Sequence, residues 1–245
     1  MKKPNLVVLI LFLSLLWGCT KNTPPKIKSD LTVSFTHTVH EHPVVLNQMQ
    51  YINANGDTFS IKTIKYFISK FTLFTENGGQ LTLPHYWYID INDPESLQKN
   101  LLQQIPHGTY SGFSFILGFT NEDNVSNMFT SNPEYLMFWP ENMGGGYHYQ
   151  KLEGQYLKNG MPHNFNFHSG GLDKTDYSIQ VIENLPFTAS QNLHNLTINM
   201  EIQNWFKSPV TWDFQYFGAG IMQNHEAQET IQQNGHDVFS FTILK

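Results

Sequence analysis

The feature that most constrains this chain is an alternation of apolar and polar residues with a period of two. That is the period of a half-buried β-strand. It is clearest over residues 31–39, where Leu31, Val33 and Phe35 alternate with serine and threonine. The same alternation recurs at residues 85–91, 113–119, 196–202 and 239–243.

Turn sequences separate these segments. Asn55-Gly56-Asp57 and Asn77-Gly78-Gly79 have the composition of tight hairpin turns, and residues 144–146 are three consecutive glycines. Many short strands joined by such turns predict an all-β fold, an antiparallel β-sandwich with long loops. One window of loose helical spacing, residues 220–233, predicts a short C-terminal helix.

Residues 129–141 lack a regular pattern and contain two prolines, so we expect a long functional or covering loop there. Its apolar stretch, residues 137–139, is suited to act as a lid on the sandwich.

The first residues have the three parts of a lipoprotein signal peptide. Lys2 and Lys3 precede an apolar run over residues 6–16, and Gly18 stands directly before Cys19. The apolar run is too short for a comfortable membrane span. We therefore predict a signal peptide over residues 1–18, lipid on Cys19, and a membrane-anchored lipoprotein on the periplasmic side of the cell envelope or on the cell surface. The alternative is an ordinary secretory peptide with an incidental cysteine.

The composition suggests one domain behind a tether. Residues 19–30 are rich in lysine, threonine and proline, which predicts a flexible tether. Residues 31–245 suit one sizeable domain, because 40% hydrophobic residues with 14% aromatics can form a core. Cys19 is the only cysteine, so no disulfide can form within the chain.

The charge pattern argues against nucleic acid as a partner. All fourteen basic residues are lysines, and the net charge is -6. Loss of residues 1–18 would remove two lysines and no acid, so the mature chain would be more acidic still. An acidic chain repels a polyanion, and without arginine it cannot form bidentate hydrogen bonds to phosphate or guanine.

Histidine is the residue type that most suggests a chemical function, namely metal binding. There are eleven, and neutral imidazole is a suitable ligand for copper and zinc. No His-x-x-x-His or His-Glu-x-x-His zinc motif is present. The spacing alone therefore does not identify a metal site, and a single histidine on an apolar face is more often a hydrogen-bonded core residue than a ligand.

Strand parity sorts the candidate histidines. His37 shares the predicted inward face of Val33 and Phe35, and His85 shares a predicted face with Trp87. His168 ends a predicted strand just before two glycines, on the face opposite Phe167, where it can reach a site formed by loops.

Two metal-independent functions remain open at this point. A surface glycan- or protein-binding lipoprotein would use Tyr86, Tyr88, Trp205 and Trp212 as a platform. A glycoside hydrolase would need two carboxylates, for which residues 90–95 or 122–123 are the candidates.

Several short segments, in this order and spacing, resemble the MbnP-like family of exported proteins, the methanobactin-associated copper-binding group and its lipoprotein relatives. The resemblance runs from about Leu31 to Leu244. The segments that carry it are residues 35–37, 51–56, 64–69, 88–90, 105–110, 115–118, 137–139, 146–147, 151–154 and 167–171, with Asn234 and Phe239.

This resemblance implies a β-sandwich, not an enzyme, that binds copper through several histidines. In some members a partner di-haem peroxidase oxidises a tryptophan to kynurenine. Carried over to this chain, the resemblance makes His37 and His168 the first candidate ligands. His85 and His40 follow, the latter from the only His-x-His spacing, residues 40–42. Trp139 and Trp87 are the candidates for oxidation.

Overall fold

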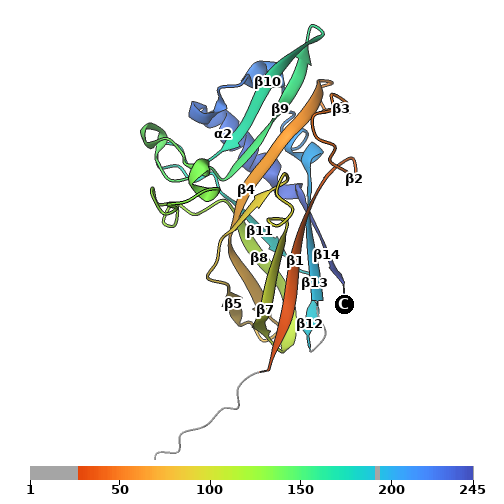
Figure 1. Ribbon diagram of the computed structural model, residues 1–245, viewed down its shortest axis with the longest axis vertical. Helices are drawn as coiled ribbons and strands as arrows, with labels where there is room; N and C mark the ends of the chain where they lie inside the picture. Colours follow the sequence, from red (N-terminus) through yellow and green to blue (C-terminus); the bar gives the residue numbers. More distant parts are fainter. Residues whose placement is uncertain (1–26, 191–193, 245) are drawn as a thin grey trace, which may run out of the picture.

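Two β-sheets form the fold over residues 27–190 and 194–244, the residues that this computed structural model describes (Figure 1). The larger sheet has the order β10 (Met161–Ser169), β9 (Gln150–Lys158), β4 (Thr58–Thr75), β8 (Gly108–Leu117) and β11 (Ile179–Glu183). Short strands extend it: β3 (Tyr51–Ile52), β5 (Gln80–Thr82) and β6 (Trp87–Asp90) pair with β4, and β12 (Phe187–Ala189) pairs with β8.

The smaller sheet has β1 (Lys28–Val39) at its centre. It has the order β14 (Phe239–Leu244), β13 (His194–Glu201), β1 and β2 (His42–Pro43), and β7 (Gln98–Pro106) also pairs with β1. The all-β sandwich is confirmed. One pairing differs from the antiparallel expectation: β1 and β13 run parallel, with Leu31 opposite His194.

Helices are few and short in the described residues. The expected C-terminal helix is present as α2 (His225–Asn234), and Asn224 caps its first turn through a hydrogen bond from the backbone N–H of Ala227. The others are α1 (Phe214–Phe217), η1 (Glu134–Met137), η2 (Glu141–Met143), η3 (Ile202–Phe206), η4 (Ile221–Gln223) and η5 (Gly235–Asp237). None of the described helices is long and apolar enough to cross a membrane.

The main core lies between the two sheets and is rich in aromatic side chains. Phe115 of the larger sheet contacts Phe239 and Phe241 of β14, and Phe35 of β1 contacts Trp87 edge-on. Strand β13 alternates strictly between buried and half-buried residues, as the sequence pattern predicts.

A second apolar cluster lies on the opposite face of the larger sheet. Phe67 belongs to it, whereas its neighbours Tyr66 and Ile68 belong to the main core, because successive strand residues point to opposite faces. The other members are Tyr88, Phe119, Met137, Tyr147, Tyr149, Leu172 and Tyr177. The irregular segment that contains η1 and η2 covers this face, as expected for residues 129–141 (Figure 1).

Of the N-terminal predictions, only the end of the tether falls within the described residues. The signal peptide, Cys19 and the tether up to residue 26 lie outside the described residues. Strand β1 begins at Lys28, three residues before the expected start at Leu31, so the last part of the predicted tether belongs to the sheet.

Candidate metal centre

His168 is the penultimate residue of β10. Its register partner on β9 is Lys151, and its neighbour Phe167 faces the main core, so the imidazole lies on the outer face of the larger sheet. The covering segment leaves it only 9% exposed. The histidine stands at a strand end beside glycines, as the sequence predicts, and its side chain is buried there.

His148 comes from the chain that leads into β9. A turn with positive φ at Gly144, Gly145 and Gly146 brings this chain back antiparallel to the end of η1. The backbone N–H of Trp139 donates to Gly146 O at 2.8 Å, and that of His148 donates to Met137 O at 2.7 Å. These bonds hold Trp139 and His148 together.

Trp139, His148 and His168 form a row of three buried rings. The centroid of His148 lies 4.7 Å from that of Trp139 and 5.0 Å from that of His168. Both contacts are close to perpendicular, with interplanar angles of 76° and 85°. The edge of each ring is thus directed at the face of its neighbour.

Each imidazole has one nitrogen held by hydrogen bonding and one nitrogen without a partner. His148 Nδ1 lies 3.0 Å from Met137 O, and His168 Nε2 lies 2.9 Å from Glu153 Oε1. The opposite nitrogens, His148 Nε2 and His168 Nδ1, are buried and have no hydrogen-bond partner, and neither does Trp139 Nε1. Outer hydrogen bonds of this kind fix the tautomer and orientation of metal-binding histidines.

Burial favours the neutral form of His148. Burial lowers its pKa well below 6.5, and the charge of Lys151 acts in the same direction. The hydrogen bond with His168 lowers the pKa of Glu153, so its carboxylate is ionised at neutral pH. A neutral imidazole has the lone pair that a metal needs.

Helix α2 fixes the backbone around His168. The buried side chain of Gln228 donates to His168 O at 2.9 Å and accepts from the N–H of Gly170 at 3.2 Å. A Cβ at Gly170 would lie 2.6 Å from the Trp139 ring, so only glycine allows the indole to approach this closely. Gln228 and Gly170 are thus positioning residues for the row of rings.

His37 is buried on the inner face of the smaller sheet, as its parity predicts. Its Nε2 lies 3.1 Å from the Tyr66 hydroxyl, and burial lowers its pKa to about 4. Tyr66 belongs to the main core, whereas His168 lies on the outer face of the larger sheet. The structure therefore does not place His37 with His168.

The expected pairing of His85 with Trp87 is not observed. Strand β6 begins only at Trp87, so His85 precedes it and is exposed, while Trp87 is buried against Phe35 and Phe71. His40 is also exposed, in a turn where its φ is 51°. Neither histidine lies in the row of rings.

The aromatic platform proposed for a metal-independent binding module is mostly absent from the surface. Trp205, Trp212 and Tyr88 are buried, and only Tyr86 is exposed. Two of the acids considered for a hydrolase form ion pairs: Asp90 pairs with Lys65 at 3.2 Å, and Asp123 pairs with Lys70 at 2.8 Å.

Within the described part of the chain, no group of three or more histidine, cysteine, aspartate or glutamate side chains is arranged to hold a metal. The site is instead a pair of histidines beside a tryptophan. Of these three residues, His148 is the one that the sequence pattern did not single out. A signal for it in the sequence is the three-glycine turn that precedes it, because such a turn brings two segments together.

Comparisons with known proteins agree with this architecture. A family model described as MbnP matches residues 28–224. Among solved structures, MbnP from Methylosinus trichosporium is similar, with a TM-score of 0.57 and 12% sequence identity over 88% of this chain and 99% of that chain. At this identity the structural likeness concerns the fold alone. The comparison with curated proteins gives no match.

Proposed function

We propose, on the premise that this chain belongs to the MbnP family, that it is a non-enzymatic copper-binding protein in which His148 and His168 hold the metal. The observation that carries the proposal is the pair of buried imidazole nitrogens without partners, His148 Nε2 and His168 Nδ1. A buried polar atom without a partner is costly, and a bound metal would remove that cost.

The donor set favours copper over zinc. Structural zinc sites normally have four protein ligands, and catalytic zinc sites have three. The two histidines are not part of any larger group of His, Cys, Asp or Glu side chains within the described residues. Imidazole is a suitable ligand for copper, and the family resemblance points to the same metal.

Trp139 is our candidate for oxidation to kynurenine by a partner di-haem peroxidase, as the resemblance implies. Its ring lies 4.7 Å from His148, and its Nε1 is buried without a partner. An oxidised product would present its new polar groups next to the histidine pair. Trp87 packs against Phe35 and Phe71 in the main core, which makes it the weaker candidate.

Lipid on Cys19 would anchor the protein in a membrane of the cell envelope. Strand β1 begins at one end of the molecule, whereas β9, β10 and α2 lie toward the other end (Figure 1). An anchor that precedes β1 would leave the histidine pair away from the point of attachment.

The test is metal analysis and intact-mass spectrometry on the full chain purified from its native host. We expect near-stoichiometric copper in the wild type and loss of copper in His148→Gln and His168→Gln. His163→Gln, an exposed position on the same strand as His168, is the matched control and should retain copper. Any mass change from indole oxidation should disappear in Trp139→Phe.

Folded His148→Gln and His168→Gln proteins that retain wild-type copper would refute the assignment of the ligands. A folded wild-type protein that is isolated without copper and does not take up added copper would refute copper binding itself. The metal-independent binding lipoprotein would then be the better hypothesis.

A further inference from the structure

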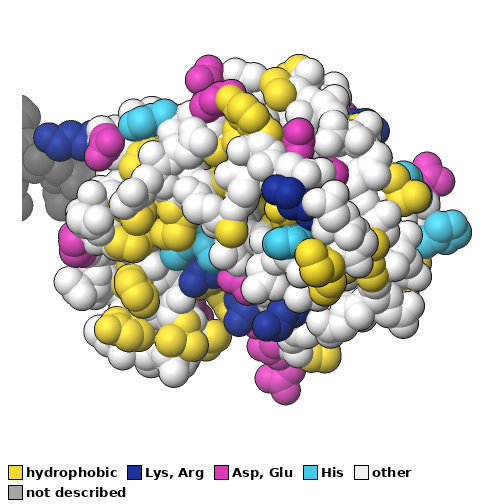
Figure 2. All heavy atoms as spheres, turned by 90° about the horizontal axis from the view of Figure 1, so that it is seen from above, with side chains coloured by type: hydrophobic (Ala, Val, Ile, Leu, Met, Phe, Trp, Pro, Cys, Tyr) yellow, Lys and Arg dark blue, Asp and Glu magenta, His cyan; other side chains and the backbone are white. Residues whose placement is uncertain are grey.

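A cleft of about 510 Å³ lies beside the histidine pair, on the outer face of β4 and β9. Glu153, which accepts the hydrogen bond from His168, forms part of its wall. Figure 2 shows lysine, acidic and histidine side chains gathered around a hollow on the face seen there. The cleft is also lined by Lys62, Lys65, Lys151, Tyr88, Leu136 and Met137.

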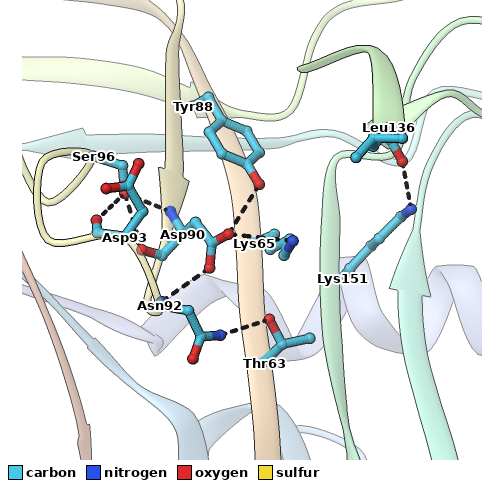
Figure 3. A network of polar contacts seen from close by, with 9 residues as sticks. All are labelled: Thr63, Lys65, Tyr88, Asp90, Asn92, Asp93, Ser96, Leu136 and Lys151. Atoms are coloured by element: carbon cyan, nitrogen blue, oxygen red, sulfur yellow. Dashed lines mark hydrogen bonds and ion pairs between the residues drawn. The ribbon is translucent and has the colours of Figure 1, made fainter. Parts of the chain in front are cut away.

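Two of these lysines occupy directly opposite positions on neighbouring strands. Lys65 of β4 is the register partner of Lys151 of β9. Like charges directly opposite each other in a sheet are destabilising. Lys65 is balanced by Asp90 at 3.2 Å, but Lys151 donates to a neutral carbonyl, Leu136 O, at 2.9 Å (Figure 3).

Burial lowers the pKa of the Lys151 ammonium; the charge of Glu153 opposes this shift, and the charge of Lys65 adds to it. The protonated form of Lys151 is thus less favourable in the cleft than in water. An anion bound between Lys65 and Lys151 would relieve this repulsion.

A β-bulge brings a third lysine to the same face. Ile61 pairs with Gly154 and Thr63 pairs with Glu153, so Lys62 is an extra residue in β4. As a result Lys62 and Thr63 both lie outside the main core, between the buried residues Ile61 and Ile64. Bulges often redirect side chains next to functional sites.

We propose that this cleft binds a small organic anion with two or more carboxylates. Three lysines from two strands would neutralise its charges, while Tyr88, Leu136 and Met137 would contact its carbon atoms. Asp90 and Glu153 leave the cleft with an excess of one positive charge, in a chain whose net charge is -6. The local excess favours a small anion, whereas the overall charge repels a polyanion. The proposal does not depend on copper binding.

The test is isothermal titration of the metal-free full chain with citrate at low ionic strength. We expect citrate to bind, and Lys62→Met and Lys151→Met each to weaken it about tenfold, because each removes a charge-assisted hydrogen bond. Lys158→Met, on the same strand as Lys151 but outside the cleft, should bind citrate as the wild type does. Acetate should bind more weakly than citrate, and added salt should reduce binding.

Absence of citrate binding, or equal affinity in the wild type, Lys62→Met and Lys151→Met, would overturn the proposal. Inorganic phosphate that binds as tightly as citrate would overturn the assignment to an organic polycarboxylate. Citrate binding retained in His148→Gln, with copper retained in Lys62→Met, would show that the two sites succeed or fail independently.

Discussion

His37 illustrates how one buried side chain can set the acid sensitivity of this protein. It is 6% exposed and lies against Tyr66, and its pKa is lowered from 6.5 to about 4 by burial. In the unfolded chain the same imidazole takes up a proton near pH 6.5. Between these two values the unfolded state binds more protons, so the free energy of unfolding must fall as the pH falls.

We therefore predict that His37→Gln makes stability less dependent on pH. Glutamine can still bond the Tyr66 hydroxyl but does not titrate in this range. Between pH 7 and pH 4 the wild type should lose about 3 kcal/mol more of its free energy of unfolding than the variant does. Urea unfolding at a series of pH values measures this difference.

His42→Gln is the matched control, because this histidine is exposed. Its stability should follow pH as that of the wild type does. Parallel pH profiles for the wild type and His37→Gln would show that His37 does not titrate as described.

At this scale the sequence pattern singled out two of the three residues of the candidate site. Trp139 and His168 could be identified from the family pattern and from a strand end. His148 could not be assigned to a face, because it follows a glycine turn where the period of two is lost. His85 was misassigned because parity was extended two residues beyond the start of β6.

Helix α2 is the element that supports the histidine pair. Its buried face presents Gln228, which bonds His168 O, Gly170 N–H and Ile221 O. The loose apolar spacing of residues 220–233 predicted a helix here. It could not predict that a glutamine would be completely buried, because glutamine is usually a surface residue.

We predict that Gln228→Met destabilises the protein by about 2 kcal/mol, because the carbonyl of His168 and the N–H of Gly170 lose a buried partner. Copper affinity should fall with it, because the His168 segment is no longer fixed. Gln233→Met, an exposed position on the same helix, should change stability by less than about 0.5 kcal/mol. Chemical denaturation and a competitive copper titration measure the two effects. Unchanged copper affinity in a folded Gln228→Met protein would exclude this supporting role.

The strands were more predictable than their pairing. Alternation and turns located β1, β8, β13 and β14 within a few residues, because each has one face in the core. The same alternation carries no information about the direction of a neighbouring strand. The parallel contact between β1 and β13 was therefore not predictable from the pattern.

For the whole molecule, the arrangement of the smaller sheet sets which backbone groups are best protected. β1 is hydrogen-bonded to β13 on one side and to β7 on the other, whereas β14 pairs with β13 at the edge of the described sheet. The two sheets share one main core, so we expect them to unfold together.

We predict that amide hydrogens of β1 exchange only by global unfolding, while those of β14 exchange faster through local opening. Strand β13, with a partner on each side, is the internal control and should behave like β1. Native-state hydrogen exchange followed by mass spectrometry measures all three strands in one experiment. Equal protection of β14 and β1 would mean that the edge strand does not open separately.

The central position of β1 also determines when the smaller sheet can form during synthesis of the chain. Its parallel partner, residues 194–201, is made long after β1, and their contact closes a long stretch of chain. Strand β1 therefore lacks its parallel partner until residues 194–201 have been made. The core between the two sheets can therefore close only after this late step, and until then the apolar face of β1 is without the strand that flanks it.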